Sequence, residues 1–353
     1  MALCWLSGPG CAGTAANRPT ITFILGADRY DVNPYYANAL RYYRQNPHAN
    51  PGQLVTACRS LREVCQYLEQ HVPPGKPWGT INLVAHGNAW TGMDLPVLPG
   101  DSSRTSAATL LAAQAAGQLP PLPDRVLDAR TEIRLHGCAL GLDTALLMTL
   151  SQTLGGADKT CPKVVSTRFF NQYELEGGCM QQGLAEFWYT SYPTYQRPTP
   201  EQLARSLGNK YPNNDLQWAD ALSRRRPRWA GDTYWRPVVV PVQWAVTYPD
   251  SAVRPALATP EAQQRWLEGQ TDLQSALQRL GLPADKFRWS FRTETMAFED
   301  GATEPAIVVE GQTTVCCVLR GVRNTEDDFY TSIQFTKYQS WTDSFVSLFC
   351  FCR

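Results

Sequence analysis

The 353-residue chain lacks the features that would take it to a membrane, to nucleic acid or out of the cell. Its 32 Lys and Arg are balanced by 32 Asp and Glu, so no net charge attracts polyanions. It has no run of about 18 apolar residues, the length that a membrane-spanning helix requires. The first 16 residues contain no Lys or Arg, unlike a secretory signal. We therefore expect a cytoplasmic protein whose partners include neither nucleic acid nor a membrane.

Spaced metal-binding pairs are also missing, although the chain contains eleven Cys. No two of them form a Cys-x-x-Cys pair, Cys350 and Cys352 are too close for the usual zinc spacing, and only four His are present. Because the number is odd and a secretory signal is lacking, we expect mostly reduced thiols, with no metal and no cofactor. Adjacent Cys316 and Cys317 lie in an apolar run and are expected on opposite faces of a strand.

The first half of the chain alternates short apolar strands with helical segments. The predicted strands are 20–26, 80–85, 131–136 and 163–167, and the predicted helices are 53–71, 105–118, 142–154 and 180–190. Alternation of this kind predicts an α/β fold with a parallel sheet covered by helices on both faces.

A Pro-rich stretch after residue 192 indicates a domain boundary. We expect a loose segment over 1–17, an α/β domain over 18–192 and an α+β domain over 193–353. In the last domain, helices are predicted at 199–222 and 259–281, and strands at 235–248, 306–309, 313–319 and 330–338.

Two predicted strands each run into a chemically reactive side chain beside a glycine. One ends in His86-Gly87, and the other ends in His136-Gly137-Cys138. Ligands bind at the carboxyl ends of the strands in open α/β sheets, so neighbouring parallel strands would bring His86 and Cys138 to one edge. Cys138 follows His86 by 52 residues, enough for one helical crossover.

An imidazole beside a thiol is an arrangement for nucleophilic catalysis. The thiolate is the attacking form, and an ordinary thiol is mostly protonated near pH 7. A neighbouring His accepts that proton and later protonates the leaving amine. The tetrahedral intermediate then needs backbone N–H donors, which we expect from Gly87 and Cys138.

This motif pair resembles that of the caspase-like cysteine peptidases, a clan that includes caspases, metacaspases, gingipain, clostripain, separase and the bacterial CHAT peptidases. Caspases also place their His about 50 residues before the Cys. The resemblance covers about residues 18–192. It implies a caspase-haemoglobinase fold and endopeptidase activity through a catalytic dyad of His86 and Cys138. His136-Gly137-Cys138-Ala139-Leu140-Gly141 stands where caspases have Gln-Ala-Cys-Arg-Gly, which favours a bacterial branch.

The resemblance also implies a protein substrate. Bacterial peptidases of this kind act on a partner protein in antiviral defence or cell death, gasdermin-like pore formers included. Two other functions fit the same residues: a catalytically inactive peptidase-fold scaffold, and a different thiol enzyme that transfers acyl groups.

Four residues are candidates for the pocket that selects the substrate. Asp28 and Arg29 follow the first strand, where Asp28 would select a basic residue before the scissile bond and Arg29 an acidic one. A solvated loop pair is the alternative for both. Ser166 and Thr167 end a strand similar to the one that lines this pocket in the family.

His136 is the alternative general base, or a residue that supports the catalytic pair without contacting substrate. It lies two residues before Cys138, so both side chains would share one face if the strand continued. We favour His86, because a residue on the same strand does not easily reach the leaving group.

Overall fold

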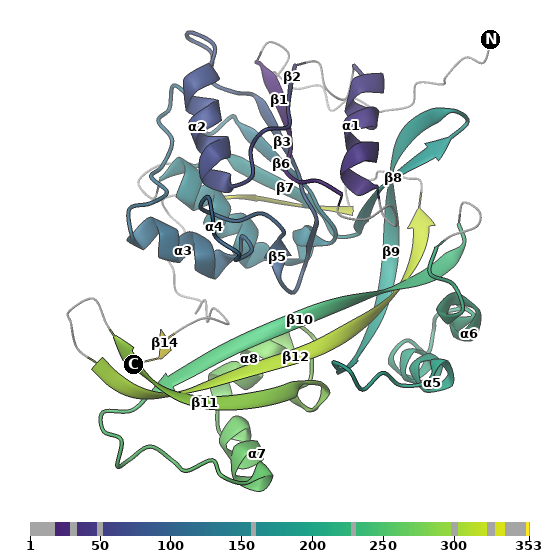
Figure 1. Ribbon diagram of the computed structural model, residues 1–353. Coiled ribbons are helices and arrows are strands. Elements are labelled where there is room, and N and C mark those ends of the chain that lie inside the picture. The colour runs from purple at the N-terminus through teal and green to yellow at the C-terminus, as the bar shows by residue number, and fades with distance from the viewer. Residues whose placement is uncertain are drawn as a thin grey trace.

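The computed structural model describes residues 18–28, 34–47, 52–156, 160–226, 231–297, 303–322, 329–335 and 351–352 (Figure 1). The segment 1–17, the candidate Arg29 and the end of the last predicted strand lie outside these residues.

The first sheet is six-stranded and mostly parallel. Apolar residues alternate along its strands, with Ile21 and Phe23 on one face of the first strand and Thr22 and Ile24 on the other. In spatial order it contains β13 (Tyr330–Gln334), β7 (Lys163–Thr167), β6 (Glu132–His136), β3 (Thr80–Val84), β1 (Thr20–Ile24) and β2 (Gln53–Val55). Only β13 runs antiparallel to its neighbour.

Helices cover both faces of this sheet, as the alternating pattern predicts. The helices are α1 (Tyr35–Gln45), α2 (Leu61–His71), α3 (Ala107–Ala115) and α4 (Thr144–Gly155). Helices α2, α3 and α4 bury their leucines against one face, while α1 packs its tyrosines on the other. The mixed α/β class expected from the sequence is therefore confirmed.

The second sheet is built from long antiparallel strands (Figure 1). It contains β14 (Phe351–Cys352), β10 (Thr233–Thr247), β12 (Thr303–Val322), β9 (Cys179–Pro193) and β8 (Phe170–Glu176), with β11 (Arg288–Ala297) also paired to β12. Only β14 runs parallel to its partner. Cys316 and Cys317 face opposite sides of β12, in two separate apolar clusters, as predicted.

Short helices pack on this second sheet. They are α5 (Pro200–Lys210), α6 (Trp218–Leu222), α7 (Pro260–Glu268), α8 (Thr271–Arg279) and the 3-10 turn η2 (Ala284–Lys286). The two long helices predicted in this half are therefore each broken into two. Thr199 and Thr259 cap α5 and α7 with their hydroxyls, as the Thr-Pro-Glu sequences predict.

Two predictions in the first half are wrong. Residues 53–71 do not form one helix: the first three make strand β2, and Ser60 begins α2 by accepting the N–H of Glu63. Residues 180–190 are not a helix but part of β9, because they pair with β8 on one side and β12 on the other.

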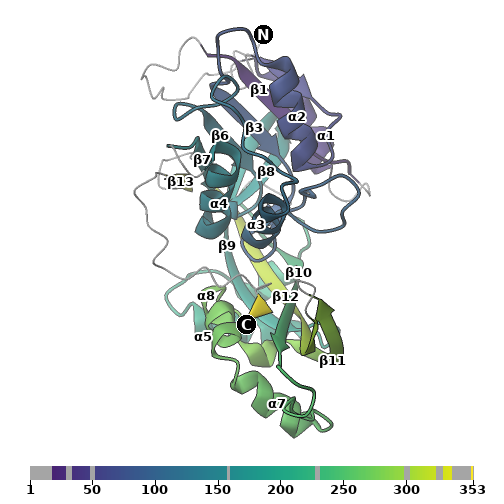
Figure 2. The ribbon, with the colours of Figure 1, turned by 90° about the vertical axis from the view of Figure 1, so that its left-hand side faces the viewer.

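Among the described strands, the chain passes between the first and second sheets three times, at points that the Pro-rich boundary does not indicate. β8 and β9 precede residue 192 yet belong to the second sheet, β13 returns to the first sheet, and β14 belongs to the second sheet again. The second sheet thus begins at Phe170 rather than after residue 192. Its strands β9 and β12 extend toward the first sheet (Figure 2). No helix among the described residues is long and apolar enough to cross a membrane.

Candidate active site

The two predicted catalytic residues lie at the same height on one edge of the first sheet. Val84 of β3 pairs with His136 of β6 in a parallel ladder, and His86 and Cys138 each follow two residues later. The chains stay adjacent beyond the ladder, since the N–H of Ala85 donates to the carbonyl of His136 at 3.3 Å. The expected juxtaposition of the two strand ends is therefore present.

Both glycines of the motifs are required by close packing. A Cβ on Gly87 would lie 2.9 Å from the side chain of Leu140, and a Cβ on Gly137 would lie 2.6 Å from the same side chain. Contacts below 3.0 Å force a neighbour to move, so any larger residue would displace Leu140. Leu140 begins the 3-10 turn η1 (Leu140–Leu142) directly after Cys138 and Ala139.

Cys138 sits at the start of a strained turn. Ala139 has φ 55°, a left-handed conformation that alanine rarely adopts, and its N–H donates to the carbonyl of Phe169 at 2.8 Å. The thiol of Cys138 lies 3.6 Å from the carbonyl oxygen of Asn171, to which it donates. Within the described part of the chain, the N–H of Cys138 has no acceptor, as an oxyanion donor requires.

Burial sets the protonation states of both groups. It raises the pKa of Cys138 to about 11 and lowers the pKa of His86 below its usual value. The free site therefore holds a neutral thiol and a neutral imidazole near pH 7. An imidazole in that state is ready to accept a proton.

Two tyrosines of α1 hold the ring of His86. The ring stacks on Tyr35 with centroids 4.4 Å apart and meets the edge of Tyr36 at 4.9 Å. The hydroxyl of Tyr36 also accepts the backbone N–H of His86 at 3.0 Å. No residue in the described ranges is hydrogen-bonded to either ring nitrogen. Packing thus orients the ring, and within the described chain both of its nitrogens are free of hydrogen bonds.

His136, the alternative base, has both ring nitrogens engaged. The amide nitrogen of Gln182 lies 3.1 Å from Nδ1 and must donate to it, so the proton is on Nε2, which lies 3.1 Å from Oδ1 of Asn82. Burial lowers the pKa of His136 to about 3. A histidine that stays neutral and saturated with hydrogen bonds does not serve as the general base.

The network around His136 extends to the acceptor of the Cys138 thiol. Gln182 donates to Oδ1 of Asn171 at 2.9 Å, and Nδ2 of Asn171 donates to the hydroxyl of Tyr35 at 3.1 Å. That hydroxyl donates to the carbonyl of His136 at 2.6 Å. The carbonyl of the same asparagine also accepts the thiol proton of Cys138. The network therefore holds two groups in place on the sheet: the Cys138 thiol, and the Tyr35 ring on which His86 stacks.

The second sheet contributes a positive charge that sequence reasoning missed. The charge of Arg236 of β10 lowers the pKa of both Cys138 and His86, and at Cys138 it opposes the larger effect of burial. Its side chain is half-buried and has no carboxylate within ion-pair distance among the residues described. No local signal marks this arginine, because pairing of β10 with β12 brings it to the site from almost a hundred residues away along the chain.

Replacing Arg236 by Met should raise the pKa of Cys138, because the charge that favours the thiolate is removed. We expect alkylation of Cys138 by iodoacetamide to become severalfold slower at a fixed pH near 9. Mass spectrometry of the alkylated peptide over a pH series measures this shift. Arg226→Met, at an exposed turn, is the matched control and should leave the profile unchanged. An unshifted Arg236→Met profile would contradict this electrostatic role.

The candidate pocket residues are engaged in the fold. Both carboxylate oxygens of Asp28 accept N–H groups from the first turn of α1, at 3.0 and 2.9 Å. The Ser166 hydroxyl donates to the carbonyl of Leu135, and that of Thr167 donates to the carbonyl of Phe329. Ser166 and Thr167 are buried, so their side chains hold strands together. Arg29 lies outside the described residues.

Comparisons with known proteins add no relative to this geometry. No protein-family model, curated protein or solved structure matches the chain.

Proposed function

We propose that the chain is a caspase-like cysteine endopeptidase in which Cys138 is the nucleophile and His86 the general base. One observation carries the proposal: the two residues follow paired parallel strands at the same height, with the imidazole nitrogens left open. The first sheet would then be the caspase-haemoglobinase sheet, with the second sheet forming a wall of the active site through Arg236.

The proposed reaction begins from neutral groups. Substrate binding brings a peptide carbonyl next to Sγ of Cys138. The thiol proton passes to His86 as Sγ attacks the carbonyl carbon, and the oxyanion accepts the N–H groups of Cys138 and Gly87. The carbon–nitrogen bond then breaks, with His86 protonating the leaving amine, and water hydrolyses the thioester with His86 again as base.

Arg236 assists the first step in this scheme. The thiolate forms in a buried setting where an unpaired negative charge is costly. A guanidinium without a carboxylate partner stabilises the developing charge while the proton moves to His86.

A peptide-based acyloxymethyl ketone tests the assignment of the nucleophile. The wild-type chain should carry one adduct, on Cys138, because of the cysteines that the structure describes it is the one at the strand end beside that of His86. Mass spectrometry of the digested protein locates the adduct, and cleavage of a peptide library defines the preferred residue before the scissile bond. Labelling spread over several cysteines, together with no cleavage of the library, would refute the proposal and favour a scaffold.

We further propose that the substrate is a protein of a bacterial cell-death or antiviral system, such as a gasdermin-like pore former. The support is the resemblance of the motif pair to the bacterial branches of the clan. Incubating such a protein with the purified chain should yield a single cut, detectable as two fragments by intact-mass measurement. Resistance of the pore former under conditions where library peptides are cleaved would remove this substrate class.

A further inference from the structure

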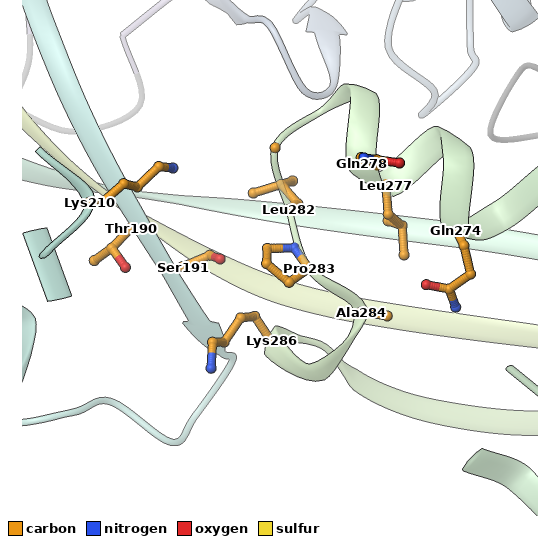
Figure 3. A pocket seen from close by; sticks show the side chains of 11 residues that line it. Thr190, Ser191, Lys210, Gln274, Leu277, Gln278, Leu282, Pro283, Ala284 and Lys286 are labelled. Carbon is orange, nitrogen blue, oxygen red and sulfur yellow. The ribbon is translucent and has the colours of Figure 1, made fainter. Parts of the chain in front are cut away.

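A cavity of about 520 Å³ lies on the second sheet, beside the end of β9 (Figure 3). Its polar lining comes from Thr190 and Ser191 of β9 and from Lys210 at the end of α5. Leu277, Leu282, Pro283 and Ala284 give it an apolar wall, and Gln278 and Lys286 complete the polar part. In Figure 3, Lys210 and Lys286 lie on either side of Ser191. The size falls in the range of small-molecule sites.

Lys210 is a cation without an ionic partner. No carboxylate of the described residues lies within ion-pair distance of it, and its ammonium instead lies 3.5 Å from the centre of the Tyr189 ring. Burial lowers the pKa of Lys210, as expected for an ammonium group that has lost water. Lys286 pairs with Asp285 at 2.8 Å, so the three groups together leave one positive charge at the cavity.

Hydrogen-bond donors face the same space. In the described chain, the hydroxyl of Ser191 and the amide of Gln278 form no hydrogen bond with protein groups. Tyr189 directs its N–H and C=O away from β12, to the hydroxyl of Tyr211 at 3.2 and 3.3 Å. Because antiparallel pairs alternate, Ser191 also directs its N–H away from β12. A ligand here meets ammonium, hydroxyl and backbone donors at once.

The lining can bind a phosphate group. It presents a lysine ammonium without an ionic partner, and lysine binds phosphate as a point charge. The leucine and proline wall is suited to an organic group attached to that phosphate.

A short chain of contacts connects this cavity with His86. Trp90 lies in the hairpin formed by β4 (Gly87–Asn88) and β5 (Gly92–Met93), directly after His86. Its indole N–H donates to the carbonyl of Leu280 at 3.2 Å, and the Tyr189 hydroxyl donates to the same carbonyl at 3.5 Å. The rings of Trp90 and Tyr189 meet edge to face at 5.2 Å. The ring that holds Lys210 therefore also supports the hairpin.

We propose that this cavity binds an organic phosphate ester and that binding is coupled to the hairpin carrying His86. When the phosphate binds, the ammonium of Lys210 moves from the Tyr189 ring to the phosphate. The loss of that contact alters how Tyr189 packs against Leu280 and Trp90. The proposal of a binding site does not depend on the peptidase assignment. Only the catalytic role of His86, the residue before the hairpin, rests on the proposed function.

Calorimetric titration of the full chain with adenosine 5′-monophosphate, glycerol 3-phosphate, adenosine and inorganic phosphate tests the site. We expect one saturable site for at least one ester, bound about tenfold more tightly than inorganic phosphate because the wall adds apolar contact. Adenosine alone should not bind. Lys210→Met keeps the packing on Tyr189 and should weaken ester binding about tenfold, whereas Lys76→Met, at an exposed loop, should not. Ser191→Ala, which removes only a hydroxyl donor, should weaken it less.

The coupling is read from alkylation of Cys138, which needs no peptidase activity. A saturating ester should change the rate in the wild-type chain at least about twofold, the change expected for even a weak coupling free energy. Trp90→Phe should bind the ester but lose this change. Absence of ester binding, or equal binding by Lys210→Met, overturns the site, and an unchanged alkylation rate overturns the coupling. Ester binding by a chain that cleaves no peptide would count against the proposed function alone.

Discussion

Replacing Cys138 by Ala is expected to abolish peptide-bond cleavage and leave the fold intact. The substitution removes the only atom proposed to bond to substrate, so the rate should fall by about 10³-fold or more. The side chain is small and half-buried, with one weak hydrogen bond to Asn171, so the free energy of unfolding should change by no more than about 1 kcal/mol. Cleavage of a reporter peptide and urea unfolding measure the two quantities.

His86→Ala should reduce cleavage by about 10²- to 10⁴-fold, the contribution of a general base. Because His86 and Cys138 act as one unit, the double variant should be no slower than the slower single variant. Cys179→Ala and His71→Ala are matched controls: Cys179 lies at the β8–β9 turn, and His71 stacks on Tyr67 at the end of α2. Undiminished cleavage by Cys138→Ala would end the assignment of the nucleophile.

The placement of the proposed catalytic pair was predictable because its signal is local. Each strand is a short apolar run that stops at a reactive residue beside glycine, and parallel pairing follows from the alternation of elements. The parallel register of β3 and β6 then places His86 and Cys138 at the same height along the two strands. The start of α2 was also readable, since Ser60 precedes Glu63 with capping spacing, but strand β2 depends on pairing with β1.

β9 was missed because both of its faces pack against apolar clusters. Phe187 and Tyr189 pack into one apolar cluster, while Trp188 and Tyr192 pack into another on the opposite side. A strand that is apolar on both faces shows no alternation, and its residues then fit helical spacing equally well. The change of sheet before residue 192 was missed for the same reason, since β9 pairs with β8 and with the distant β12.

The supporting residues of the site needed the structure. Arg236 arrives from the second sheet, and Gln182 lies in the strand that was expected to be a helix. Asn82 carried a weak signal: it is a polar residue inside an otherwise apolar strand, the kind of residue that must find a partner when buried. Its partner, His136, was considered as a base or as a supporting residue, but no partner for it was predicted.

His136 should make the protein sensitive to acid. Its pKa is about 3 in the folded chain, against an ordinary value of about 6.5, so the unfolded chain binds a proton between these values and the folded chain does not. A lowered folded-state pKa gives stability that is present above the unfolded value and is lost as pH falls toward the folded one. Between pH 7.5 and 4.5, this loss amounts to about 2.5 kcal/mol.

A comparison with His136→Gln isolates this contribution. Glutamine still offers a donor and an acceptor to Asn82 and Gln182 but does not titrate. Asp143, whose pKa burial raises to about 6, acts in the opposite direction, but it is common to both chains and cancels in the difference. We therefore expect the wild-type chain to lose about 2.5 kcal/mol more than the variant, measured by urea unfolding at the two pH values. Equal losses would show that His136 is protonated in the folded chain. The argument that His136 is neutral and fully hydrogen-bonded, and so is not the general base, would then be wrong.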